Sequence, residues 1–523
     1  MEIKRVGLVK QISDPTVTWD IIVVGGGATG LGIAVDAASR GFKTLLLEQS
    51  DFAKGTSSRS TKLVHGGVRY LAQGNIRLVT EALRERGILL HNAPHLVRNE
   101  TFIIPNYTWW NAIFYSIGLS VYDLLAGKRS FGHSRLISKN ELIRRIPNIR
   151  QKGLKAGVLY HDGQFDDARL AVSLAQTGIN KGGVVLNYFR VTGLMKHLGR
   201  VSGVNARDQE TGISYTLEAK SVINATGVFV DELLGMDVPE SRPIVSPSQG
   251  IHLVFDKSFL GPHDALMIPK TTDGRVLFAI PWHDRTLVGT TDTPLNAHQL
   301  EPVALEEEIQ FILETAGKYL TRIPTRKDVL SVYAGLRPLA APQGENEKTK
   351  EISRSHKLIV SSSGLITITG GKWTTYRQMA EETVNQAILV AGLPNRICQT
   401  KTLSLHGFKE SSDWNDHFFV YGSDATSVKV LSKENPAWKE VMDDRLPYIA
   451  AEVIWAVRFE MARTIEDVLA RRTRALFLDA RAAIDMAPMV ARMIAAELKK
   501  EEIWEKEQIV SFLSVAKNYL VDS

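Results

Sequence analysis

The chain has 523 residues, of which 44% are hydrophobic and 23% charged, and its formal net charge is +6. This length predicts two or three domains, because one hydrophobic core rarely extends over so long a chain. The mild basic excess suits anionic substrates or anionic lipid, and no nucleic-acid partner is expected from it. The single cysteine, Cys398, excludes internal disulfides and cysteine-rich metal sites.

Residues 18–50 are predicted to form a strand, a helix and a second strand that together bind a dinucleotide. An apolar strand enters a glycine-rich turn. There Gly25 permits the sharp bend, Gly27 lets a pyrophosphate approach the backbone, and Gly30 lets the following helix pack closely. The second strand ends in Glu48, whose carboxylate can accept hydrogen bonds from both ribose hydroxyls of an adenine nucleotide.

The next segments are a loop, a helix and a long apolar stretch. Residues 51–70 are rich in Ser, Thr, Gly and Arg without an apolar period, which is typical of a functional loop, and residues 78–90 predict an amphipathic helix. Residues 108–126 carry two tryptophans at one end and cations just beyond the other. This pattern favours a helix in a membrane interface, while a helix buried inside the chain or facing a second copy in a homodimer fits the spacing equally well.

Short strands dominate from about residue 243 to 340, and the chain becomes helical and charged after about residue 396. We therefore predict an α/β fold with a discontinuous nucleotide-binding domain of Rossmann type, an inserted antiparallel β-rich domain that binds substrate, and a helical C-terminal domain. The expected boundaries are 18–90, 150–240 and 345–395 for the first domain, 91–149 and 241–344 for the second, and 396–523 for the third.

In an NAD-dependent dehydrogenase, the two polar segments 51–70 and 370–377 would have no evident function. A buried flavin, in contrast, needs contacts from several distant segments of the chain. Characteristic motifs lie at residues 25–30, 56–70, 166–170, 224–227, 289–292, 335–339, 370–377 and 464–474. In these motifs the chain resembles the FAD-dependent glycerol-3-phosphate dehydrogenases, which belong to the wider group of D-amino-acid-oxidase-like flavoproteins. The resemblance covers about residues 18–480 and implies that the cofactor is FAD.

Four of these motifs, at 25–30, 56–70, 224–227 and 370–377, together with Glu48 and Val191, are expected to supply the residues that contact the cofactor. They are Gly25, Gly27, Ala28, Thr29, Gly30, Glu48, Thr56, Ser57, Ser58, Lys62, Leu63, His65, Gly66, Gly67, Val191, Ala225, Thr226, Gly227, Gly371, Lys372, Thr374 and Thr375. The short hydroxyl side chains of Ser57 and Ser58 can reach phosphate or ribitol, and the glycines after His65 let the backbone pass close to the isoalloxazine. A helix that begins after Lys372 would stabilise negative charge on the reduced flavin.

The resemblance also implies a substrate, sn-glycerol 3-phosphate, which is oxidised at C2 to dihydroxyacetone phosphate with hydride transfer to flavin N5. Arg69 and Arg337 occupy the family's substrate-contacting positions, and guanidinium groups fork onto phosphate oxygens. Tyr70, Lys372 and His252 complete the predicted substrate site.

Catalysis requires a base for the hydroxyl proton, and the sequence leaves its identity open. Histidine is favoured because its pKa lies near neutrality, so His252 and His65 are both candidates. Lys372 could act as the base instead, or stabilise the developing alkoxide, and Arg337 completes the set of catalytic candidates. No metal ion is expected, because the flavin accepts the electrons.

The family's usual electron acceptor is a membrane quinone, which would give segment 108–126 a purpose. We therefore expect a cytoplasmic protein that is peripheral on the cytoplasmic face of the inner membrane, on anionic lipid. The first 18 residues lack the pattern of a signal peptide, and no run of about 20 uncharged apolar residues suggests a spanning helix. The alternatives are an oxygen-using glycerol-3-phosphate oxidase, which the short chain disfavours, an amine or amino-acid oxidoreductase, and a non-catalytic flavin-binding module.

Overall fold

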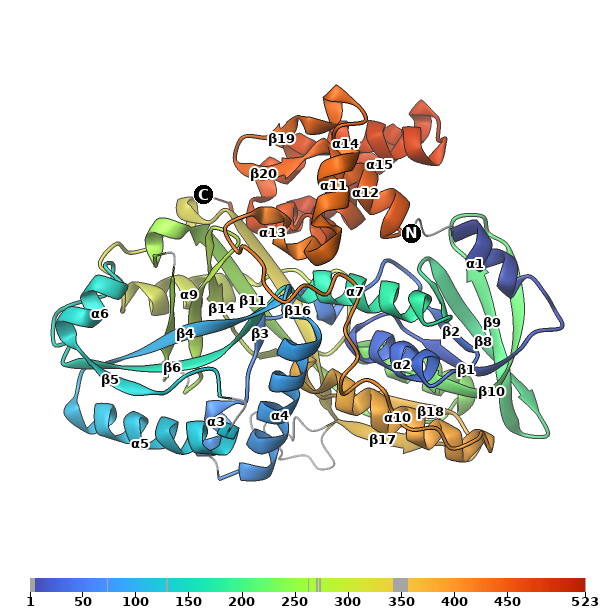
Figure 1. The fold of residues 1–523 in the computed structure, drawn as a ribbon, viewed down its shortest axis with the longest axis horizontal. Helices are drawn as coiled ribbons and strands as arrows, with labels where there is room; N and C mark the ends of the chain where they lie inside the picture. The colour runs from blue at the N-terminus through green and yellow to red at the C-terminus, as the bar shows by residue number, and fades with distance from the viewer. Residues whose placement is uncertain are drawn as a thin grey trace.

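The computed structural model describes residues 5–72, 74–127, 130–261, 263–269, 271, 274–341 and 356–522, with the side chains of Arg69 and Ala72 outside the description. Two large sheets lie side by side, and the C-terminal domain, drawn in orange and red in Figure 1, lies against both.

The first sheet carries the nucleotide-binding unit. Its strands are β1 (Thr18–Val24), β2 (Thr44–Leu47), β7 (Val184–Leu186), β8 (Phe189–His197), β9 (Arg200–Asp208), β10 (Ser214–Asn224), β17 (Lys357–Val360) and β18 (Ile366–Thr369). Five of them pair in parallel in the order β18-β10-β1-β2-β7. β17 pairs antiparallel at one edge, and β9 and β8 extend β10 as antiparallel strands. The central strands are buried apolar runs because both faces of a parallel sheet are covered.

Three helices lie side by side over this sheet: α10 (Tyr376–Ala391), α2 (Ala28–Ser39) and α7 (Asp167–Asn180). Gly32 of α2 faces the ring of Tyr376, and a Cβ at this position would lie 2.8 Å from that ring. The absence of a side chain therefore sets the close approach of α2 and α10.

The second sheet is mostly antiparallel. Its strands are β3 (Leu63–Val64), β4 (Val97–Asn106), β5 (Arg135–Ser138), β6 (Ala156–Phe165), β11 (Val245–Asp256), β12 (Asp264–Ile268), β13 (Leu277–Trp282), β14 (Arg285–Gly289), β15 (Thr293–Pro294) and β16 (Ser331–Ala340). Successive side chains point to opposite faces. Ile103 packs with α6 (Lys139–Arg145) and α9 (Glu306–Gly317), while Phe102 and Ile104 belong to the core shared with α5 (Trp109–Ala126) and the C-terminal domain.

The C-terminal domain is mainly helical. It contains α11 (Ala425–Leu431), β19 (Val441–Asp443), β20 (Leu446–Ile449), α12 (Ala450–Phe459), the π-helical turn η9 (Asp467–Arg472), α13 (Ala475–Leu478), α14 (Ala480–Leu498) and α15 (Glu502–Ala516). The remaining helices are α1 (Arg5–Ile12), α3 (Val68–Ala72), α4 (Ile76–Asn92) and α8 (Val230–Asp237). Short 3-10 turns are η1 (Thr56–Ser58), η3 (Gly227–Phe229), η4 (Lys257–Phe259), η5 (Arg326–Asp328), η6 (Trp373–Thr375), η7 (His417–Asp424), η8 (Pro436–Lys439) and η10 (Lys517–Tyr519).

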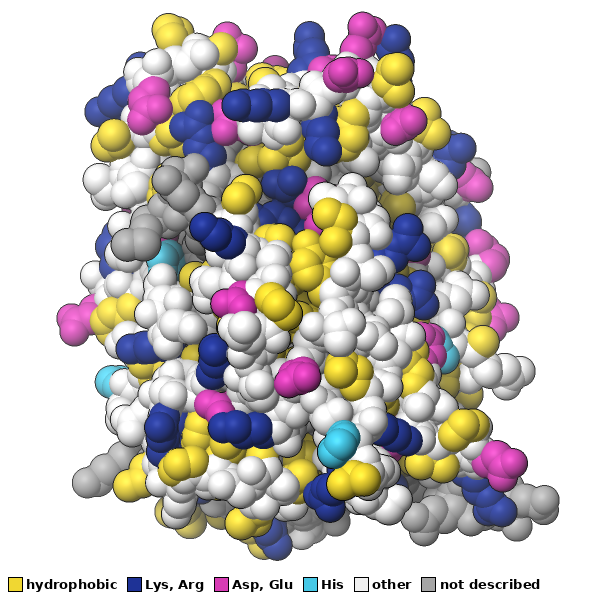
Figure 2. Space-filling model, turned by 90° about the vertical axis from the view of Figure 1, so that its right-hand side faces the viewer, with side chains coloured by type: hydrophobic (Ala, Val, Ile, Leu, Met, Phe, Trp, Pro, Cys, Tyr) yellow, Lys and Arg dark blue, Asp and Glu magenta, His cyan; other side chains and the backbone are white. Residues whose placement is uncertain are grey.

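The predicted fold class is confirmed: a Rossmann-type α/β unit, an antiparallel sheet and a helical C-terminal domain are all present. The expected boundary at residue 150 differs from the sheet topology, because β6 pairs with β4 and β3 in the second sheet. The chain therefore returns to the first unit only after Phe165, where α7 begins. Among the described residues, no helix combines the length and the apolar character needed to cross a bilayer. Figure 2 shows basic, acidic and hydrophobic side chains interspersed over one face of the molecule.

Candidate functional site

A cavity of about 400 Å³ is walled by both sheets and by the loop that follows β2. Its lining comes from segments that are far apart in the sequence: the turn after β1, residues 53–57 and 59–61, the ends of β10 and β18, and strands β11 and β16. One cavity therefore joins the glycine-rich turn to the polar side chains of the second sheet.

The glycine-rich turn lies at the cavity wall because it connects β1 directly to α2. Gly25 has φ +109°, and a Cβ there would lie 2.6 Å from the carbonyl oxygen of Ala225. Gly25, Gly27, Ala28 and Thr29 line the cavity. Gly30 lies behind the turn, where a Cβ would collide with the Gly25 carbonyl, so its role is to let helix and turn approach.

Glu48 lines the same cavity from the end of β2. Its carboxylate accepts hydrogen bonds from the backbone N–H of Gly26 at 2.6 Å and of Ser50 at 2.8 Å. Burial raises the pKa of Glu48 above its ordinary value, and the two backbone donors oppose that rise. Val191 and the segment 225–227, both predicted to contact the cofactor, lie in the neighbouring wall.

The loop after β2 contributes Thr56 and Ser57 to the cavity, and β3 and the residue after it contribute Leu63 and His65. The hydroxyl of Ser57 accepts a hydrogen bond from the Ala28 N–H at 2.9 Å, so this loop and the start of α2 form one wall. The lining of the cavity does not include four other predicted cofactor residues of this region, namely Ser58, Lys62, Gly66 and Gly67.

Lys62 lies beneath the loop instead of in the cavity wall. Its ammonium group donates to a carboxylate oxygen of Asp167 and to the carbonyl of Ser58, both at 2.7 Å. Burial lowers the pKa of Lys62 to about 7, and the Asp167 carboxylate opposes that shift. The rings of Trp282 and Tyr333 also face the ammonium group. The contacts of Lys62 are therefore those of a residue that supports the loop from below.

His252 reaches the cavity from β11. Its Nε2 atom lies 2.9 Å from the hydroxyl oxygen of Thr61, and its ring stacks on Tyr333. Burial, aided by the charges of Lys62 and Arg337, lowers the pKa of His252 well below its ordinary value. The imidazole is therefore neutral at physiological pH and can accept a proton.

Arg337 lies on β16, opposite Ser248 of β11, and lines the cavity. Its guanidinium donates to the carbonyl oxygens of Gln249 at 3.2 Å and Thr291 at 3.0 Å, and to the hydroxyl of Thr290 at 3.1 Å. It also lies 3.4 Å from a carboxylate oxygen of Asp292. These contacts hold the guanidinium in one orientation at the cavity wall.

Lys372 and Tyr70 line the cavity together, with the Lys372 ammonium 3.9 Å from the centre of the Tyr70 ring. Gly371 and Thr374 lie beside them in the wall, and the Thr374 hydroxyl accepts a hydrogen bond from the His65 N–H at 3.2 Å. Thr375 is buried behind the cavity lining. The side chain of Arg69, the second predicted phosphate ligand, lies outside the described part of the structure.

Several wall residues were not singled out by the sequence. They include Gln49, Arg59, Thr61, Arg190, Phe229, Gly250, Leu336 and Trp373. Most of them flank a predicted residue on the same strand or loop, and this adjacency is the signal that could have found them. Gly250 is different, because only the tertiary structure brings it against Arg337. A Cβ at Gly250 would lie 2.6 Å from Arg337 Nη1.

Comparisons with known proteins found two matching family models and several similar proteins. The family model of FAD-dependent oxidoreductases matches residues 20–377, and that of the C-terminal domain of alpha-glycerophosphate oxidase matches residues 365–508. The mitochondrial glycerol-3-phosphate dehydrogenase of Rattus norvegicus is 39% identical over 94% of this chain and 72% of its own length. The Schizosaccharomyces pombe protein of the same name is 38% identical over 99% of this chain and 89% of its own length. A solved glycerol-3-phosphate dehydrogenase from Bacillus halodurans, complexed with FAD, has a TM-score of 0.80 and 32% identity, covering 99% of this chain and 98% of its own.

Proposed function

The chain belongs to the family of FAD-dependent oxidoreductases, and on that premise we propose that it oxidises sn-glycerol 3-phosphate at C2 to dihydroxyacetone phosphate. The observation that carries this proposal is that Arg337, Lys372 and His252 line one cavity together with the glycine-rich turn. Two cationic side chains and a neutral imidazole beside a nucleotide site suit a small phosphorylated alcohol.

The cavity residues fit FAD. Gly25 and Gly27 leave the backbone bare where a pyrophosphate would approach the N-terminus of α2, which carries a partial positive charge. The Glu48 carboxylate and Val191 would hold the adenosine part. When bound, FAD supplies the acceptor for the hydride from C2. The backbone of Gly371 follows β18 with φ +76°, a conformation that glycine adopts without strain.

Arg337 is assigned to the substrate phosphate, with Lys372 as a second cation. Both side chains line the cavity, and the guanidinium is oriented by two backbone carbonyls before any substrate arrives. A guanidinium fixed in this way loses little rotamer freedom on binding, so its attraction for phosphate is not offset by ordering the side chain. Arg69 remains a predicted second phosphate ligand.

His252 is assigned as the base that takes the C2 hydroxyl proton at its Nε2 atom. Among the three candidates, His252 has a lowered pKa that keeps it neutral and a hydroxyl partner, Thr61, at the cavity wall. Lys372 would then stabilise the negative charge that develops on the substrate oxygen as the proton leaves. His65 is assigned to the wall of the cavity.

The test is anaerobic mixing of the FAD-loaded protein with glycerol 3-phosphate. We expect glycerol 3-phosphate to bleach the absorption of the bound flavin. Glycerol, glycine and L-proline should leave this absorption unchanged. Bleaching by an amino acid and none by glycerol 3-phosphate would replace this proposal with the amino-acid oxidoreductase. No bleaching by any of the four compounds would favour the non-catalytic binding module.

We assign α5 to a membrane surface that brings the protein to a quinone acceptor. The exposed side chains of this helix are mostly apolar: Trp109, Trp110, Ile113, Phe114, Ile117, Val121 and Leu124. Trp110 is 82% and Leu124 80% exposed, so the apolar face extends along the whole helix. Aromatic and aliphatic side chains on one face of a helix bind the interface between lipid headgroups and acyl chains.

Sedimentation with vesicles of anionic and neutral lipid tests the surface. We expect the wild type to bind and the Trp109→Glu/Trp110→Glu variant to stay in the supernatant while keeping dye-linked activity. Equal vesicle binding by the wild type and the variant would show that α5 is not the membrane-binding surface. A monomer–dimer change in analytical ultracentrifugation of the variant would instead assign the helix to a homodimer.

Comparing quinone-dependent turnover with hydrogen peroxide release separates the dehydrogenase from the oxidase.

A further inference from the structure

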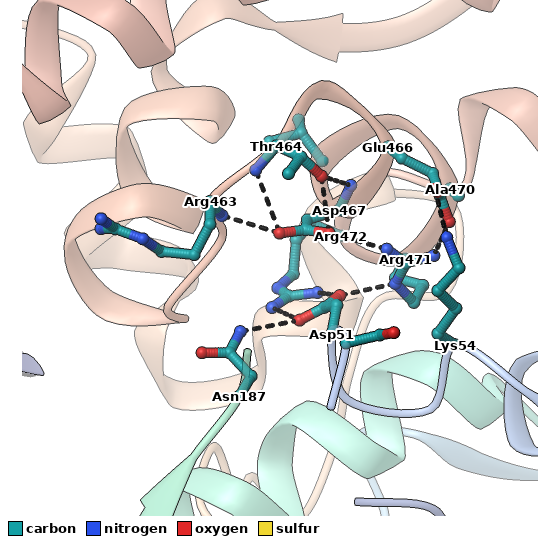
Figure 3. Close-up of polar contacts among 12 residues, drawn as sticks. Asp51, Lys54, Asn187, Arg463, Thr464, Glu466, Asp467, Ala470, Arg471 and Arg472 are labelled. Carbon is teal, nitrogen blue, oxygen red and sulfur yellow. Dashed lines mark hydrogen bonds and ion pairs between the residues drawn. The ribbon is translucent and has the colours of Figure 1, made fainter. Parts of the chain in front are cut away.

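A buried cluster of charges joins the C-terminal domain to the loop after β2. Asp51 lies in that loop and has no exposed surface. Its carboxylate accepts from Arg472 Nη1 at 2.7 Å and Nη2 at 2.9 Å, from Arg471 Nε at 2.5 Å and from the Asn187 amide at 3.1 Å. Figure 3 shows both guanidinium groups directed at this one carboxylate. Both arginines belong to η9 of the C-terminal domain.

The cluster has a second point of contact with the same loop. The ammonium group of Lys54 donates to Glu466 at 2.6 Å, and Glu466 accepts from Arg471 at 2.6 Å with its other oxygen. Arg471 also donates to Asp467 at 2.7 Å. Three carboxylates and three cations therefore balance one another within the cluster (Figure 3). A buried set of charges persists only where each charge is paired in this way.

The ion pairs dominate the protonation of Asp51 and Glu466. Burial alone would raise the pKa of Asp51, but Arg472 and Arg471 outweigh it and hold the pKa well below its ordinary value. The pKa of Glu466 is likewise lowered to about 2, by Arg471 and Lys54 against the effect of burial. Asp51 and Glu466 are therefore charged throughout the physiological pH range, whereas burial and the neighbouring Asp51 carboxylate raise the pKa of Asp467.

The loop held by the cluster forms a wall of the cavity. We call residues 51–57 the cavity loop; its members from Ala53 to Ser57 all line the cavity. The Ala53 N–H donates to the carbonyl of Gly26 in the glycine-rich turn at 2.9 Å, and the Thr56 hydroxyl donates to the carbonyl of Leu336 at 2.6 Å. The cavity loop thus connects the glycine-rich turn to β16, which carries Arg337.

The backbone of the cavity loop also requires support from outside. Ala53 has φ +60°, a left-handed conformation that is unfavourable for a residue with a Cβ. Such a conformation persists where the surrounding structure determines it. Asp51 and Lys54, the two residues anchored by the C-terminal domain, lie on either side of Ala53.

We propose that the Asp51–Arg471–Arg472 cluster is a clamp through which the C-terminal domain keeps FAD in the cavity. Asp51, Arg471 and Arg472 act as positioning residues: they hold the cavity loop against the glycine-rich turn and do not line the cavity themselves. The inference rests on FAD as the cofactor and is independent of the substrate. Loss of the clamp frees the loop to move away from Gly26 and opens a route for FAD to leave.

The test compares Asp51→Asn with Glu452→Gln. Glu452 is an equally buried carboxylate in the C-terminal domain, bonded to Tyr421 at 2.9 Å and His417 at 3.1 Å, and it does not line the cavity. FAD release is followed by the fluorescence of free flavin after dilution, without substrate, and the unfolding midpoint is measured by far-UV circular dichroism. Each variant is compared at the same temperature interval below its own midpoint, which removes the effect of general destabilisation.

We expect Asp51→Asn to release FAD about tenfold faster than the wild type or more, because it removes the charge of the one carboxylate that Arg471 and Arg472 share. Glu452→Gln should release FAD at the wild-type rate. The visible circular dichroism of the bound flavin should change only in Asp51→Asn. Equal release by the two variants would overturn the clamp. Should Asp51→Asn not fold, Glu466→Gln decides, because its side chain is 13% exposed and it meets both Lys54 and Arg471. Wild-type release by Glu466→Gln would then overturn the proposal.

Discussion

The Nε2 atom of His252 lies 2.9 Å from the hydroxyl oxygen of Thr61, although the two residues are 191 positions apart in the sequence. Gly289, on the strand paired with His252, makes this contact possible, because a Cβ there would lie 2.9 Å from Nε2. The imidazole is thus held between a hydroxyl group and a bare backbone at the cavity wall. This arrangement fixes the orientation of the His252 ring at the cavity wall.

The first prediction concerns pH. Because burial lowers the pKa of His252 well below 6.5, the base stays neutral as the pH falls through that value. We expect kcat/KM to remain level from pH 7.5 down past 6.5 and to decline only at lower pH. His252→Gln should lose about 10²- to 10⁴-fold in kcat at neutral pH, while the exposed His197→Gln stays at wild type. An acid limb centred near 6.5 in the wild type would assign the base elsewhere.

The second prediction concerns the phosphate. Arg337→Ala removes a charge-assisted fork and should weaken substrate binding by about 2–4 kcal/mol, a factor of roughly 30 to 1,000 in apparent affinity. Arg337→Lys should recover only part of this, since one ammonium cannot donate to Gln249, Thr291 and the phosphate in the same geometry. Steady-state KM for glycerol 3-phosphate measures the effect, with the exposed Arg77→Ala as control. An unchanged KM in Arg337→Ala would remove this residue from the substrate site.

The third prediction concerns Gly250. An added Cβ would lie 2.6 Å from Arg337 Nη1 and 2.6 Å from the Thr290 hydroxyl, so alanine must displace the guanidinium. We expect Gly250→Ala to raise KM about tenfold while FAD content stays complete, because the cofactor wall is untouched. Gly118→Ala in α5 is the control, since its Cβ would meet no atom within 4 Å. Normal KM in Gly250→Ala would show that the guanidinium can bind phosphate from a shifted position.

The fourth prediction concerns Glu308, a buried residue of α9. Its carboxylate accepts from the side chains of Gln249, Thr291 and Thr293, each at 2.7 Å. Gln249 and Thr291 are the residues whose carbonyls orient Arg337. Glu308→Ala should therefore raise KM for glycerol 3-phosphate and lower the free energy of unfolding by about 2–4 kcal/mol, with kcat changed little. If Glu308→Ala lowers the free energy of unfolding but leaves KM at the wild-type value, Glu308 has only a structural role.

The fifth prediction concerns the stability effect of Lys62. Its pKa is lowered by burial to about 7 in the folded protein and returns to about 10.4 on unfolding. Between these values the unfolded state binds the additional proton. The free energy of unfolding should therefore rise with pH from about 7 to about 10, by up to roughly 1.4 kcal/mol per pH unit. Urea unfolding at a series of pH values should show this rise reduced in Lys62→Met and retained in Lys433→Met. Equal slopes in both variants would mean that Lys62 stays charged in the folded protein.

Much of the fold follows from local pattern. The glycine spacing at 25–30 and the apolar strands around it predict the turn between β1 and α2. Both signals are local, because the conformation of a turn and the period of an apolar strand depend on residues close together in the chain. The helices predicted at 78–90 and 108–126 appear as α4 and α5 for the same reason. The boundary at 150 was less well predicted, because an apolar strand such as β6 carries no sign of which sheet it will join.

The same distinction between local and long-range contacts applies to the candidate site. The sequence by itself determined the glycine-rich turn after β1 and the acidic end of β2, since both depend on residues adjacent in the chain. It predicted Arg337 of β16 as a site residue through the resemblance to a known family. Only the tertiary structure decided that Lys62 pairs with Asp167 under the cavity, that Gly250 makes room for Arg337, and that Arg472 meets Asp51 across 421 residues. The physical reason is burial: these contacts join strands and domains that are distant in the chain. Their charges become strongly coupled only once packing has excluded water.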